Sequence, residues 1–72
     1  MCDYQLTVPH EFGAFNLGVH LTIMHIQGGE EPIFTTIETK DATIYSIPFE
    51  EEDQMYKFDK IIRKSMPYLF KS

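Results

Sequence analysis

The stretch EEEDQMYKFDKIIRKSM, residues 50–66, decides the fold. Acidic residues open this stretch and basic residues close it, which suits the positive first turn and the negative last turn of an α-helix. Apolar side chains recur in it at helical spacing and form one stripe, made of Met55, Phe58, Ile62 and Met66. Pro67 follows, and proline disfavours helical backbone at the residue before it. The stretch therefore predicts an amphipathic helix that covers one face of a sheet.

Runs with the alternation of half-buried strands precede this helix. Each run places apolar side chains at every second position and ends near proline, glycine or a polar turn. They cover residues 3–8, 15–27, 33–39 and 42–47. The run 15–27 is longer than most strands, so we expect a bend near Gly18. Gly28–Pro32 predicts a hairpin loop, and short turns between consecutive strands predict an antiparallel meander.

The predicted fold is one α+β domain of residues 1–72, with a sheet of three or four antiparallel strands packed by the carboxyl-terminal helix. An apolar tail over residues 67–72 either packs back or contacts a partner. A domain of this size buries only about 60% of its extended-chain surface, so a bound partner or self-association is expected to add stability. Cys2 is the only cysteine, and residues 1–8 lack the features of a signal peptide. No disulfide forms within such a chain, and we expect a reducing, cytoplasmic environment.

Charge is distributed unevenly along the chain. The formal net charge is -5 at pH 7. Residues 1–39 contain no Lys or Arg, whereas from Lys40 onward six acids are balanced by six bases. The imbalance comes from five acids in the first part, which are Asp3, Glu11, Glu30, Glu31 and Glu38. Such a surface repels phosphate backbones and attracts basic proteins.

Residues that carry catalysis or bind metals are sparse. His10, His20 and His25 lack the paired spacing of a structural zinc site. Cys2 lies next to the amino terminus, a poor position for a nucleophile, and Gly28–Gly29 precedes two glutamates where a phosphate loop needs a helix start with a lysine. We therefore predict no metal, no cofactor and no enzymatic activity. A small metal-dependent or acid–base enzyme is the second alternative, and it requires the three histidines to converge with carboxylates.

A nucleic-acid-binding module is the first alternative. Aromatic side chains on an open sheet can stack bases, and Tyr4, Phe34 and Tyr45 are candidates for such a platform. The predicted helix and tail supply a basic patch, made of Lys57, Lys60, Arg63, Lys64 and Lys71. The predicted strands carry no Lys or Arg, which disfavours this alternative.

The remaining features favour binding another protein. A helix start explains the acids of residues 50–53, but local structure does not explain the acids of the first part. The predicted contact residues are four of these acids and part of the apolar tail, namely Glu11, Glu30, Glu31, Glu38, Tyr68, Leu69 and Phe70. In size, charge and lack of catalytic motifs, the chain resembles the small acidic proteins with which bacteriophages block host enzymes. The resemblance implies a stoichiometric inhibitor of a larger nucleic-acid-handling protein with a basic surface, acting in the host cytoplasm.

Overall fold

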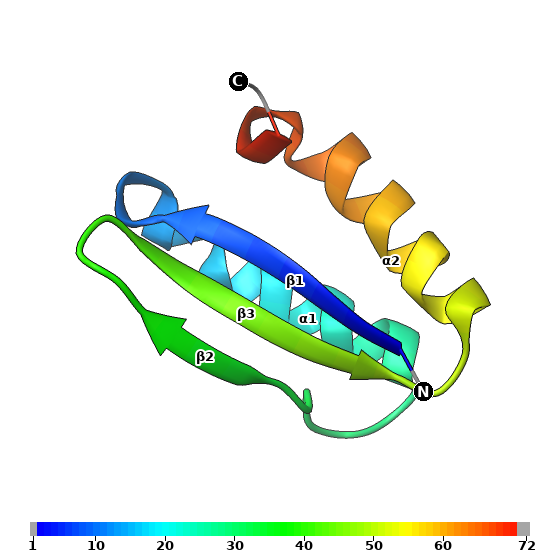
Figure 1. Ribbon diagram of the computed structural model, residues 1–72. Coiled ribbons are helices and arrows are strands. Elements are labelled where there is room, and N and C mark those ends of the chain that lie inside the picture. Colours follow the sequence, from blue (N-terminus) through cyan, green and yellow to red (C-terminus); the bar gives the residue numbers. More distant parts are fainter. Residues whose placement is uncertain (1, 71–72) are drawn as a thin grey trace.

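The computed structural model describes residues 2–70, and its elements follow one another as shown in Figure 1. They are β1 (Cys2–Pro9), η1 (His10–Phe15), α1 (Asn16–Gln27), β2 (Thr35–Glu38), β3 (Ala42–Phe49), α2 (Glu52–Ser65) and η2 (Pro67–Phe70). Lys71 and Ser72, the end of the predicted apolar tail, lie outside the described residues. Within residues 2–70, no helix has the length and apolar character needed to cross a membrane.

β3 is the central strand of a three-stranded antiparallel sheet with the order β1-β3-β2. β1 pairs with it over its full length, from Cys2 opposite Phe49 to Pro9 opposite Ala42. β2 pairs with the other edge of β3 over its four residues. Both helices pack on the same face, and Figure 1 views the sheet from the other face, with α1 behind it. The prediction of an antiparallel α+β fold is confirmed.

The core lies between the covered face of the sheet and the two helices. Every second side chain of β3 is buried, which is the alternation of a sheet with one covered face. α2 contributes Phe58 and Ile62, and both are fully buried. The ring of Phe58 lies 5.3 Å from that of Tyr4 and 5.4 Å from that of Phe49, measured between centroids. The predicted packing of the carboxyl-terminal helix on the sheet is confirmed.

The strand expected at residues 15–27 is wrong, because this segment forms α1. Its buried side chains, Val19, Ile23 and Ile26, recur at the spacing of one helix face. The segment contains no Asp, Glu, Lys or Arg that would mark a solvent-facing side, so its apolar residues match an alternating pattern as well as a helical one. Tertiary structure decides between the two patterns. One helix covers only part of a three-stranded sheet, and α1 covers the rest.

The expected meander and the expected hairpin loop at Gly28–Pro32 are wrong for the same reason. α1 carries the chain back along the sheet, so β1 and β2 run in the same direction with β3 between them. Gly28 ends α1 with a φ of 74°, and its N–H donates to the carbonyl oxygen of Met24 at 2.9 Å. β3 continues through Pro48, its expected end, because β1 pairs with it as far as Phe49.

Replacing Gly28 by Ala tests this helix end. The Gly28→Ala variant should lose about 1 kcal/mol of unfolding free energy, because a Cβ atom disfavours left-handed backbone. An added Cβ meets no atom within 4 Å, so the cost is purely conformational. Gly13→Ala is the matched control, since that position is equally open and its φ is not positive. Urea denaturation followed by circular dichroism measures both, and equal stabilities of the two variants would contradict the cap.

Candidate protein-binding surface

The outer face of α1 is apolar although it faces solvent. Leu17 is 68% exposed and Leu21 is 51% exposed. One turn further, His25 is exposed and Met24 is half-buried. We call these four residues the α1 stripe. α2 lies in the same layer and carries exposed acids and bases, whereas α1 contains no Asp, Glu, Lys or Arg.

Aromatic side chains pack together where η1, the start of α1 and η2 meet. The ring of Phe15 is 40% exposed and lies 5.1 Å from that of Tyr68, which in turn lies 5.0 Å from that of Phe12. The predicted contact residue Tyr68 therefore belongs to this aromatic cluster. Leu69 and Phe70 are half-buried and pack against the core. The described part of the predicted tail thus packs back onto the domain.

The loop after α1 closes the carboxyl-terminal end of the stripe and carries Glu30 and Glu31, both exposed. The amide group of Gln27 holds this loop. Its oxygen accepts a hydrogen bond from the N–H of Ile33 at 2.8 Å, and its nitrogen donates to the carbonyl oxygen of Ile33 at 2.8 Å. The same nitrogen donates to the carbonyl oxygen of Pro48 at 3.2 Å. One side chain therefore ties the helix end, the loop and the central strand together.

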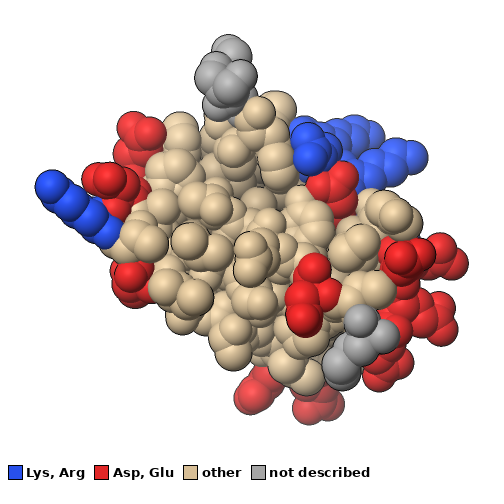
Figure 2. All heavy atoms as spheres, in the orientation of Figure 1, with Lys and Arg blue, Asp and Glu red and all other residues tan. Residues whose placement is uncertain are grey.

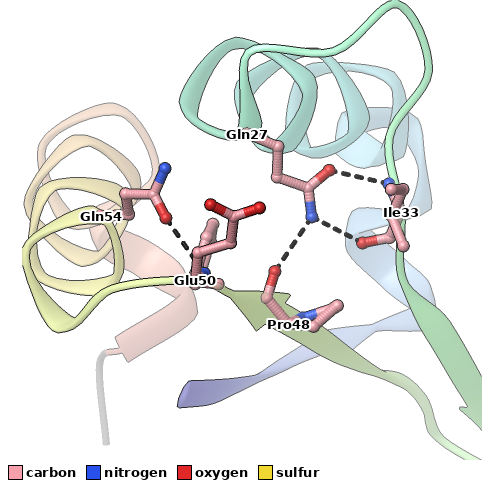
Figure 3. A pocket seen from close by; sticks show the side chains of 6 residues that line it. Gln27, Ile33, Pro48, Glu50 and Gln54 are labelled. Carbon is pink, nitrogen blue, oxygen red and sulfur yellow. Dashed lines mark hydrogen bonds between the residues drawn. The ribbon is translucent and has the colours of Figure 1, made fainter. Parts of the chain in front are cut away.

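A pocket of 190 Å³ opens where this loop meets the junction of β3 and α2 (Figure 3). It is lined by Gln27, Ile33, Pro48, Phe49, Glu50 and Gln54. The amide oxygen of Gln54 accepts hydrogen bonds from the N–H groups of Glu50 and Glu51 at 3.1 and 3.2 Å. In Figure 3 the carboxylate of Glu50 points between the amide groups of Gln27 and Gln54. No hydrogen bond or ion pair to this carboxylate is found within residues 2–70.

Acidic side chains gather around this pocket. They come from the loop after α1 and from the start of α2, and we call Glu30, Glu31, Glu50, Glu51, Glu52 and Asp53 the acidic end. Figure 2 shows acidic side chains at the end of the molecule where α2 begins and basic ones over its later turns. Among the described residues, the salt bridges join His10 to Glu38 and Arg63 to Asp59, so neither involves the acidic end. Of the residues 50–53, expected to serve mainly as a helix start, Glu50 therefore also lines a pocket.

The structure divides the predicted acidic contact residues between two places. Glu30 and Glu31 belong to the acidic end. Glu38 lies at the far end of β2, where its carboxylate is 3.4 Å from Nε2 of His10 and accepts a hydrogen bond from Oγ1 of Thr43 at 3.0 Å. Glu11 is exposed in η1, next to His10. The four acids therefore do not form one surface.

The uncovered face of the sheet is also largely uncharged (Figure 2). Its exposed Ile37 lies opposite Ile44, but polar side chains such as Gln5, Thr7 and Ser46 alternate with the apolar ones. This mixture is ordinary for the solvent face of a sheet, whereas an apolar outer face is unusual for a surface helix. The α1 stripe is therefore the stronger candidate surface.

The histidines expected in the enzyme alternative have separate partners. His10 contacts Glu38, and Nε2 of His20 lies 3.2 Å from the hydroxyl of Tyr45, with the His20 ring stacked at 4.7 Å on Phe34. His25 is exposed on the α1 stripe. In the described part of the chain, no three side chains of His, Cys, Asp or Glu are grouped so that they could hold a metal ion. The convergence that the enzyme alternative requires is not found.

The aromatic platform of the nucleic-acid alternative is not found either. Tyr45 is buried on the covered face of the sheet, and this burial, together with the charge of Glu38, raises the pKa of its hydroxyl. Tyr4 packs against Phe58, and its hydroxyl donates to Asp59. Burial, and then this carboxylate, raise the pKa of Tyr4. Both tyrosines therefore pack with the core of the domain.

Substitutions of Gln27 test whether its side chain holds the loop beside the pocket. Replacing Gln27 by Ala removes three hydrogen bonds, so the free energy of unfolding should fall by about 1–3 kcal/mol. Gln27→Glu is the matched control, because it keeps the acceptor for the N–H of Ile33 and loses the two donated bonds. Amide hydrogen exchange at Ile33 should stay slow in the Glu variant and become fast in the Ala variant. Equal exchange rates in all three proteins would show that Gln27 does not hold the loop.

No protein-family model, no curated protein and no solved structure matches this chain.

Proposed function

We propose that the protein is a non-enzymatic module that binds one larger protein stoichiometrically, with the α1 stripe at the centre of the contact. The observation that carries this proposal is the exposure of Leu17 and Leu21 on a helix without Asp, Glu, Lys or Arg. Exposed apolar surface has a cost in water, and a protein that retains it usually covers it with a partner. The neighbouring helix shows that the fold itself does not require such a surface.

The α1 stripe supplies apolar anchors of the size found in protein interfaces. About half to two thirds of each leucine is exposed, so burying both contributes about 1–2 kcal/mol for each side chain. Phe15 and Tyr68 add aromatic surface at one end, and aromatic residues are enriched at the centres of interfaces. Apolar contact of this kind supplies affinity, and charges around it supply orientation.

The acidic end supplies that orientation and indicates a basic partner. Its side chains lie at the carboxyl-terminal end of the stripe, where the loop with Glu30 and Glu31 follows α1. A cluster of one sign of charge speeds encounter with a surface of the opposite sign. Proteins that handle nucleic acids present such basic surfaces, and an acidic module bound there excludes phosphate backbones. The activity that follows is inhibition by occlusion.

Two leucine substitutions test the apolar contact. The double variant Leu17→Gln, Leu21→Gln should lose the partner that the unaltered protein captures from an extract of its source organism. The matched control is Ile37→Gln, Tyr56→Gln, which removes two side chains that are 62% and 61% exposed elsewhere on the molecule. The captured partner is then titrated calorimetrically. Binding at one-to-one stoichiometry should weaken at least tenfold in the α1 variant and remain within twofold in the control.

Circular dichroism and urea denaturation of both variants establish that they fold alike. Equal retention of the partner by the α1 variant and the control would refute the role of the stripe. A protein that captures only itself, and whose self-association is lost in the α1 variant, would replace the proposed partner by a second copy.

Charge reversal tests the acidic end separately. Glu30→Lys, Glu31→Lys should slow association at low ionic strength, and added salt should reduce the difference because it screens exposed charges. Glu38→Lys, Asp41→Lys makes the same change in net charge at the other end of the β2–β3 hairpin. Stopped-flow or surface-plasmon-resonance rates with the purified partner compare the two variants. Equal slowing in both would mean that net charge, and not the acidic end, governs the encounter.

A further inference from the structure

We infer that the pocket beside the carboxyl-terminal end of α1 receives an arginine side chain of the partner. This inference deepens the proposed function and rests on it, because it names the group that the acidic end recognises. The pocket lies at the junction of the central strand, α2 and the carboxyl-terminal end of α1, the helix that carries the α1 stripe. A partner that covers the stripe therefore reaches the pocket without leaving the surface.

The charge of the pocket selects a cation. Glu50 contributes a lining carboxylate, and within residues 2–70 no side chain of opposite charge forms a salt bridge with it. Glu30 and Glu31 lie in the loop whose two ends, Gln27 and Ile33, also line the pocket. An anion would meet uncompensated carboxylates here, so charge complementarity favours a cationic occupant.

The other lining groups select a cation with an apolar stem. Ile33, Pro48 and Phe49 give the pocket apolar walls. The amide groups of Gln27 and Gln54 bond to the surrounding backbone and so hold the walls in place. This leaves Glu50 as the charged group that faces an occupant. Long basic side chains bury their methylene groups along apolar surface and place the charged group beyond it.

Arginine fits this arrangement better than lysine. Its planar guanidinium donates two parallel hydrogen bonds to one carboxylate, whereas a lysine ammonium is a compact point charge. Glu50 is exposed, and its carboxylate points between the held amide groups of Gln27 and Gln54. A flat donor entering along the apolar side can meet both carboxylate oxygens.

A small-molecule titration tests the pocket without the partner. N-acetyl-L-arginine amide is added to the isotope-labelled protein, and amide chemical shifts are followed by NMR. N-acetyl-L-citrulline amide is the matched neutral probe, and N-acetyl-L-lysine amide is a cationic probe that lacks the planar guanidinium. The arginine probe should shift the amides of Gln27, Ile33, Glu50 and Gln54, and it should bind about tenfold more tightly than the citrulline probe. The lysine probe should bind with intermediate affinity.

Variants localise the effect. Glu50→Gln should weaken the binding of the arginine probe about tenfold and leave the binding of the citrulline probe unchanged. Glu52 belongs to the same cluster but does not line the pocket, so Glu52→Gln should change the affinity of either probe by less than twofold. Equal binding of arginine and citrulline, or an unchanged affinity in Glu50→Gln, would overturn the inference. Shifts spread over all acidic residues would also overturn it, because they mean non-specific ion pairing only. The Leu17→Gln, Leu21→Gln variant should bind the arginine probe with unchanged affinity. Loss of partner binding and loss of arginine binding are therefore separate results.

Discussion

The pairing of β1 with β3 is the constraint on which the rest of the structure depends. It joins Cys2 to Phe49 and Pro9 to Ala42, so it brings the first residues of the chain against a strand formed some forty residues later. Leu6 and Val8 then share one face of the sheet with the buried side chains of β3, and that face needs a cover. Two helices cover this face: α1, which precedes β3 in the sequence, and α2, which follows it. Every site described above follows from this arrangement.

One consequence is that both helices bury an inner face but differ in the side chains of their outer faces. α2 follows the ordinary rules for a surface helix, with Phe58 and Ile62 turned inward, acids in its first turn and Arg63 and Lys64 in its last. α1 buries an equally good inner face but leaves Leu17 and Leu21 in solvent. Natural sequences agree with their fold at most positions, and local disagreements tend to lie at functional sites. The outer face of α1 is such a disagreement, and this is why the function is sought there.

The sequence alone predicts the elements whose pattern admits a single interpretation. Charge order and a strict apolar stripe identify α2, and clean alternation identifies the strands around Leu6 and Ile47. α1 could not be predicted, because a charge-free apolar segment fits the periods of strand and helix alike. The role of Gly28 is then predicted wrongly, because a glycine pair is typical both of a hairpin loop and of a helix end. Glu30 and Glu31 are visible as unexplained charge, but their proximity to Glu50 depends on strand order, which no local pattern encodes.

The acidic end also couples binding to stability. Its six carboxylates form no salt bridge in the described part of the chain, and they lie on the loop after α1 and at the start of α2. The helix dipole of α2 favours acids at its first turn, but it gives no comparable support to Glu30 and Glu31. In the proposed complex, a cationic partner would compensate these charges while it covers the α1 stripe, and a ligand that binds only the folded state stabilises it by mass action. A folded chain of 72 residues has little stability to spare. In the proposed complex, the surface with uncompensated charge in the free protein is therefore the surface through which the partner would stabilise the fold.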